Sequence, residues 1–167
     1  MHDDLVINTG PLIALACACG DWGALRYAAR ASIVVPRPVL NEIRAGPAGS
    51  PGQDLALPPH VIVDDAVIVP RHLHALLDPG EAAVIAVALQ RGIPCVAIDE
   101  LAGRRVARVH GLLVTGSLGI LVEMKRQVPD FPLEASIRRM VAGGVLLSES
   151  VIGHALKSAL PSAAAPA

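Results

Sequence analysis

The sequence predicts a three-layer α/β/α sandwich with a central parallel sheet, and three observations support this fold class. Short apolar runs alternate with helical segments along most of the 167 residues. The apolar runs are continuous, which is typical of strands covered by helices on both faces. Aromatic residues make up only 2% of the chain, so we expect a core of Ala, Val, Leu and Ile, which suits helices packed on a buried sheet.

Short strands are expected, because runs rich in Val and Ile are followed by a turn or by the start of a helix. They are placed at residues 5–7, 32–35, 95–98 and 112–114. Residues 61–63 and 67–69 are also rich in strand-forming residues, and one of these two runs is expected at an edge of the sheet. The Gly- and Pro-rich residues 45–59 are expected to form a surface loop.

Helices are expected between these strands, wherever a start signal precedes an apolar run. The strongest signal combines Asp78 as N-cap, Pro79 at the first helical position and Glu81 at the third. A second one is Ser148, the expected N-cap of an amphipathic C-terminal helix. The expected helices cover residues 12–16, 21–30, 71–77, 79–91 and 100–109, with others starting at 38 and 117 and two more after 130.

Residues 1–160 are expected to form a single domain, with 130–160 as a C-terminal helical extension and 161–167 as a disordered tail. No apolar stretch reaches the ~20 residues that a membrane span needs, and the acidic N-terminus is unlike a secretory signal. We therefore expect a cytoplasmic protein without a membrane partner. The net charge of −1 argues against coating nucleic acid through bulk positive charge. The amphipathic last helix favours a homodimer.

Four side chains with oxygen ligands are expected at one edge of the sheet. Asn8 and Asp99 end strands, Glu81 starts a helix, and Glu42 lies one turn into another helix. In an open parallel sheet, ligands bind outside the carboxyl ends of the strands. Hard divalent cations prefer oxygen ligands of this kind. We therefore predict that these four side chains form a divalent-metal site.

Around these residues the sequence resembles the PIN-domain family, small metal-dependent ribonucleases that include many toxins of toxin–antitoxin pairs. Four segments look like the motifs of that family, in order: VINTGPLI at 6–13, PVLNEI at 38–43, PGEAAVIAVA at 79–88 and VAIDE at 96–100. Residues 99–107 and 114–121 look closest to an uncharacterised PIN-like branch. The resemblance covers most of the chain and implies a PIN-like fold.

The resemblance implies an endoribonuclease that hydrolyses RNA phosphodiesters with bound Mg²⁺ or Mn²⁺. Glu42, Glu81 and Asp99 would be the catalytic acids, and Asn8 would join them as a metal ligand. Such a metal lowers the pKa of a bound water and neutralises charge on the phosphate. Side chains expected to contact RNA are Thr9, Arg104, Arg105, Arg108, Thr115 and Ser117. An antitoxin protein is the expected partner of a toxin in this family.

One departure from the family pattern leaves the question of enzymatic activity open. Asn8 stands where the nucleases usually have Asp, so the expected site has three anionic ligands and not four. The alternative hypothesis is a non-catalytic PIN-like module that binds nucleic acid or a protein partner. Each residue also has a structural explanation: Glu81 and Asp99 as helix-capping residues, Glu42 as an exposed helical acid and Asn8 as a turn residue.

Overall fold

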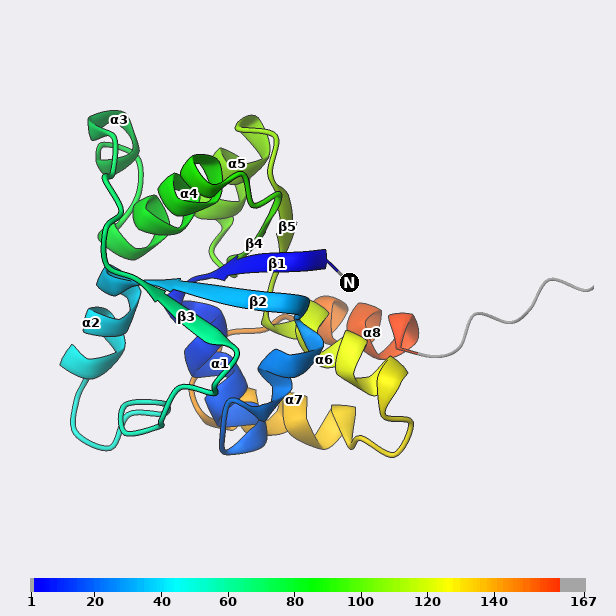
Figure 1. Cartoon of the computed structure of the whole chain (residues 1–167). Coiled ribbons are helices and arrows are strands. Elements are labelled where there is room, and N and C mark those ends of the chain that lie inside the picture. The colour runs from blue at the N-terminus through cyan, green and yellow to red at the C-terminus, as the bar shows by residue number, and fades with distance from the viewer. Residues whose placement is uncertain (1, 160–167) are drawn as a thin grey trace, which may run out of the picture.

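The computed structural model describes residues 2–159 and contains one five-stranded sheet, all parallel, with the strand order β3-β2-β1-β4-β5 (Figure 1). The strands are β1 (His2–Ile7), β2 (Ala29–Pro36), β3 (Val61–Asp64), β4 (Cys95–Ala97) and β5 (Leu113–Thr115). In the middle strand Leu5, Val6 and Ile7 are fully buried, because helices cover both faces of the sheet. The predicted α/β/α sandwich is confirmed.

Two layers of helices enclose the sheet (Figure 1). One layer contains α3 (Arg71–His74), α4 (Pro79–Arg91) and α5 (Leu101–Val109). The other contains α1 (Thr9–Cys19), the 3-10 helix η1 (Gly23–Tyr27), α6 (Ser117–Gln127), α7 (Leu133–Ala142) and α8 (Glu149–Ser158). The remaining helix, α2 (Arg37–Ala45), contacts both α1 and α4 and so joins the two layers.

The direction of the chain across the sheet reverses between β1 and β4. From β1 the chain moves to one side through β2 and β3, and it then returns to the other side for β4 and β5. Val6 pairs with Val96, and Ile7 pairs with Ala97. Asn8 extends this pairing, since its backbone N–H donates to the Ala97 carbonyl at 3.0 Å. Open α/β sheets bind ligands at such a switch point.

Both predicted N-caps are confirmed. Asp78 Oδ1 accepts from the backbone N–H of Glu81 at 2.7 Å, and Ser148 Oγ accepts from the N–H of Val151 at 3.3 Å. The C-terminal helix α8 buries Ala155 against its neighbours and leaves Val151 45% exposed. The homodimer expected from this helix stays a prediction.

Some predicted elements were wrong. The helix expected over 21–30 is replaced by η1 and the start of β2, because Ala29 pairs with His2 in the sheet. The indole of Trp22 donates to the Leu12 carbonyl at 3.0 Å and fixes the turn before η1. Residues 67–69 form no strand, and β3 is the edge strand. The short helix expected over 71–77 ends at His74.

Two expectations concern the limits of the described chain. The disordered tail predicted for 161–167 lies outside the described residues. Within residues 2–159, no helix combines the length and the apolar character that crossing a membrane would require.

Candidate metal centre

Asn8 lies at the switch point with an unused side-chain oxygen. The residue is only 3% exposed, and Asn8 Oδ1 has no hydrogen-bond partner within the described residues. Its side chain does not cap α1, although it occupies the N-cap position, so a turn role does not account for it. An unsatisfied buried polar group costs about 1–3 kcal/mol. A cation at this position would provide the missing partner.

Glu81 lies close by, in the first turn of α4, and is in the same situation. The residue is 4% exposed, and among the described residues Glu81 Oε1 has no hydrogen-bond partner. Burial raises the pKa of this carboxyl to about 7, and the charges of Asp78 and Glu100 add to the rise. The backbone amides of Gly103 and Asp78 oppose it. A buried acid among other acids is a typical feature of a functional site.

Glu42 and Asp99 each have one oxygen bound inside the protein. Glu42 Oε2 accepts from Thr9 Oγ1 at 2.5 Å, and Asp99 Oδ1 accepts from the backbone N–H of Ser117 at 2.9 Å. Asp99 is exposed as a residue, but desolvation of its carboxyl raises its pKa, and the hydrogen bonds from Ser117 oppose this rise. Asp99 therefore caps α6 across the sheet edge and not its own helix α5. Glu42 is half-buried and hydrogen-bonded, and so is not a free surface acid.

A glycine lies directly against the carboxylate of each of the three acids Glu42, Glu81 and Asp99. A Cβ at Gly80 would lie 2.5 Å from Glu42 Oε2, and a Cβ at Gly103 or Gly116 would collide with Glu81 or Asp99. Gly103 is within α5, where glycine disfavours the helix by about 1 kcal/mol relative to alanine. The space that Gly103 leaves is occupied by the Glu81 carboxylate. These glycines let the helix backbones approach the acids closely.

Glu100 belongs to the same cluster, and sequence reasoning missed it. A Cβ at Gly10 would lie 2.8 Å from Glu100 Oε1, which places this carboxylate against the start of α1. Glu100 is exposed as a residue, but desolvation of its carboxyl raises its pKa, and so do the charges of Asp99 and Asp78. The signal available in the sequence was the pair of consecutive acids directly after a strand. We refer to Asn8, Glu42, Glu81, Asp99 and Glu100 together as the acidic rim.

Three of the side chains expected to contact RNA, those of Thr9, Arg104 and Ser117, have structural contacts of their own. Thr9 and the buried Ser117 hold the acids Glu42 and Asp99. Arg104 turns inward and donates from one terminal nitrogen to the carbonyls of Ile98 at 2.7 Å and Thr115 at 2.9 Å, which fastens the ends of β4 and β5. The side chains of Arg105 and Arg108 are exposed. Their contacts with RNA stay predictions.

The donor set fits a hard cation by its chemistry, since it combines carboxylate and amide oxygens, two of them unsatisfied. Across residues 2–159, however, no group of three or more His, Cys, Asp or Glu side chains is already arranged to hold a metal ion. One oxygen of Glu42 and one of Asp99 face hydrogen-bond donors of the protein. A complete metal site would therefore use their second oxygens or require the two side chains to rotate.

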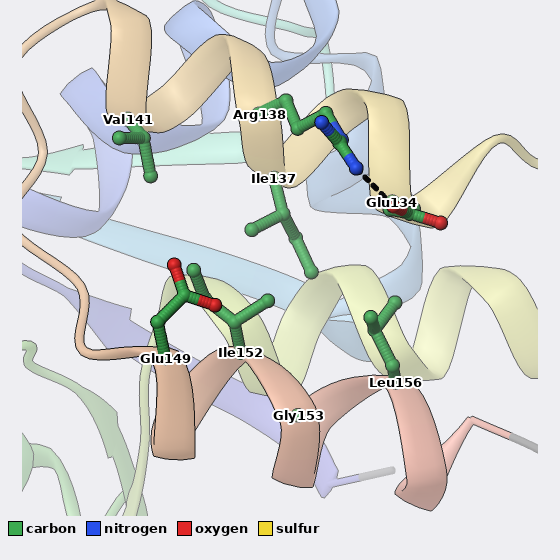
Figure 2. A pocket seen from close by; sticks show the side chains of 8 residues that line it. All are labelled: Glu134, Ile137, Arg138, Val141, Glu149, Ile152, Gly153 and Leu156. Atoms are coloured by element: carbon green, nitrogen blue, oxygen red, sulfur yellow. Dashed lines mark hydrogen bonds and ion pairs between the residues drawn. The ribbon is translucent and has the colours of Figure 1, made fainter.

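A separate groove of about 430 Å³ lies between α7 and α8, and no residue of the acidic rim lines it (Figure 2). Ile137, Ile152 and Leu156 line it, and the Glu134–Arg138 ion pair closes one side. Its lining is mostly apolar, and its charged groups are already paired or exposed. The groove offers no cluster of oxygen ligands for a metal.

Comparison with known families agrees with this arrangement. The family model described as DUF3368, PIN domain, matches residues 4–160. No curated protein and no solved structure matches the chain at a significant level. The matched segment contains the whole acidic rim and all five strands but the first two residues of β1. The chain therefore belongs to the PIN-domain family.

Proposed function

We propose that this PIN domain is a metal-dependent endoribonuclease that uses Mg²⁺ or Mn²⁺ held at the acidic rim. One observation carries the proposal: Asn8 and Glu81 place two buried, unsatisfied oxygens at the switch point of the sheet, next to further acids. A protein gains nothing in stability from burying Glu81 without a counter-ion. Such an arrangement is typical of a site that takes its positive charge from a ligand.

Asn8, Glu42, Glu81 and Asp99 would hold the metal, with Glu100 as a further acid beside them. Bound there, a divalent cation would lower the pKa of a water molecule and neutralise charge on a phosphodiester. The protein itself positions the ligands. Thr9 orients Glu42, Ser117 orients Asp99, and Arg104 keeps the ends of β4 and β5 together below them.

The test is cleavage of labelled RNA by the purified chain with Mg²⁺ or Mn²⁺ and with EDTA. We expect cleavage that depends on the metal and that is lost in the double variant Glu81→Gln with Asp99→Asn. The matched control is Glu134→Gln with Glu149→Gln, which removes the same charge from α7 and α8 and should keep wild-type activity. A wild-type chain that is inactive with both metals, or a fully active rim variant, would refute the proposal.

Asn8 supports a second candidate function, a PIN module that binds RNA or a protein without cleaving it. An amide is a neutral ligand, so the rim has less negative charge here than a rim with Asp at this position. The variant Asn8→Asp distinguishes the two candidates. If the wild type only binds RNA and Asn8→Asp cleaves it, the non-catalytic function is supported for the natural chain. If the wild type cleaves, it is excluded.

We extend the proposal to a biological role, the toxin of a toxin–antitoxin pair. The support for this role is the resemblance of the sequence to PIN-domain toxins. Expression of the wild type should arrest bacterial growth, and co-expression of a small protein encoded next to it should relieve the arrest. Growth unaffected by the wild type, or equal arrest by the Glu81→Gln with Asp99→Asn variant, would remove this role.

A further inference from the structure

The helices α3 and α5 carry basic side chains that form no ion pair among the described residues. Residues 66–77 and 101–122 contain neither Asp nor Glu. The basic residues of these two segments are Arg71, His72, His74, Arg104, Arg105, Arg108 and His110. Within the described part of the chain, none of them forms an ion pair. Two arginines of the opposite layer are paired, Arg126 with Glu123 at 3.5 Å and Arg138 with Glu134 at 2.5 Å.

The first of these basic side chains, Arg104, lies next to the acidic rim. The charge of Asp99 acts on Arg104, and both side chains lie against the position of a Cβ at Gly116. Arg108 lies one helical turn further along α5, on the same face. Burial and the charge of Arg108 lower the pKa of Arg104. The positive charge therefore continues outward from Asp99 along α5.

Further basic side chains connect α5 with α3. His110 follows the last turn of α5, and its Nδ1 lies 2.9 Å from the Val106 carbonyl. Its ring is nearly parallel to that of His72, with an interplanar angle of 12° and 6.1 Å between the ring centroids. This contact joins the end of α5 to α3, where Arg71 and His74 are exposed beside His72.

We propose that this surface, from Arg104 through Arg108 and His110 to His72 and Arg71, binds the backbone of a single-stranded RNA that extends from the acidic rim. The inference rests on the proposed function, because it concerns the path of the substrate of that site. Unpaired arginines suit phosphate groups. The exposed ring of His72 can stack on an unpaired base, with the half-buried His110 behind it. The surface is continuous with the acidic rim, so an RNA strand bound to it could reach the proposed metal site. This continuity favours RNA as the ligand, rather than an acidic protein.

The experiment measures the affinity of a labelled single-stranded RNA for the Glu81→Gln chain in EDTA, over a series of salt concentrations. Glu81→Gln and EDTA prevent cleavage, so binding is measured on its own. Adding Arg71→Ala with Arg108→Ala should weaken binding about tenfold. It should also reduce the salt slope, the steepness with which the logarithm of the binding constant falls with the logarithm of the salt concentration. We expect a reduction of about 1.4, since each lost phosphate contact on a single strand reduces this slope by about 0.7. His72→Ala with His110→Ala should weaken binding less, by about threefold.

The matched control is Arg126→Ala with Arg138→Ala, which removes two exposed arginines from the opposite layer. It should leave the affinity and the salt slope unchanged. The inference is wrong if the wild-type surface binds no RNA, if both arginine pairs weaken binding equally, or if neither does. It is also wrong if polyglutamate competes as well as unlabelled RNA, because the surface would then suit an acidic protein. Surface-specific binding together with absent cleavage would refute only the proposed nuclease activity.

Discussion

Asp64 and Glu81 are both buried acids at the carboxyl edge of the sheet, and the protein stabilises only one of them. Asp64 ends β3 and is 5% exposed, and its carboxylate binds Arg91 at 2.6 Å and the N–H of Ala66 at 2.9 Å. Glu81 is equally buried, lacks a cationic partner in the described chain and lies among other acids. Burial alone therefore does not identify a functional acid. What distinguishes Glu81 from Asp64 is the missing counter-ion.

The largest effect that separates the two acids should appear in catalysis. We expect Glu81→Gln to reduce RNA cleavage about a thousandfold, because it removes an anionic ligand from the proposed metal site. The measurement is single-turnover cleavage with saturating Mn²⁺. Asp64→Asn should cleave at the wild-type rate, since β3 lies two strands away from β1. Equal losses in the two variants would show that both acids are structural.

The pH dependence of stability should follow Glu81. Its pKa rises from the usual 4.5 to about 7 in the folded chain, so between these pH values the folded state binds more protons than the unfolded state. Stability without metal should therefore fall as the pH rises from 4.5 to 7 and then level off, by up to about 3 kcal/mol.

Urea unfolding in EDTA at pH 5 and pH 8 measures this dependence. Glu81→Gln should remove most of the difference between the two pH values. Mg²⁺ should restore stability at pH 8, because a ligand that binds only the folded chain stabilises it. Stability that rises over this window in the wild type, or that responds to Mg²⁺ equally in Glu81→Gln, would contradict the assignment.

A smaller effect on stability is expected at Asp64, whose carboxylate is paired. Asp64→Asn should destabilise the fold by about 2 kcal/mol at pH 7, because the change leaves Arg91 without its partner. The loss is moderate because the Arg91 side chain is 43% exposed and can turn to water. Thermal unfolding measures it. Asp65→Asn is the control, since the Asp65–Arg37 pair is exposed and little change is expected. A stabilised Asp64→Asn variant would remove the contrast with Glu81.

The smallest effects concern two glycines inside helices. Gly103→Ala should cost about 1 kcal/mol, because the added methyl group displaces the Glu81 carboxylate and this cost exceeds the gain in helix propensity. Gly153→Ala in α8 should stabilise the fold by about 0.5–1 kcal/mol, since a Cβ there meets open space. Urea unfolding compares the two. Stabilisation by both substitutions would show that Gly103 has no steric role at the rim.

Short-range sequence patterns were sufficient to predict the fold. Contacts between residues far apart in the sequence could not be predicted from such patterns. The parallel sheet and the caps Asp78 and Ser148 follow from patterns within a few residues of each other. The helix expected over 21–30 did not form, because pairing of β2 with β1 overrides local helix preference. Glu100 of the acidic rim and Gly103, which packs against Glu81, show the same limit. Glu100 looks like an ordinary helix start, and nothing near Gly103 in the sequence shows that a carboxylate of α4 needs its space.

The central place of β1 determines when the acidic rim can assemble during synthesis. Its partner β2 begins at Ala29, whereas its other partner β4 begins at Cys95. A chain still growing on the ribosome can pair β1, β2 and β3 early, but the second edge of β1 remains open until Cys95 has emerged. Contacts of such long sequence separation form late. The acidic rim therefore cannot be complete before Asp99 and Glu100 have been synthesised, whereas Asn8 and Glu42 are in place much earlier.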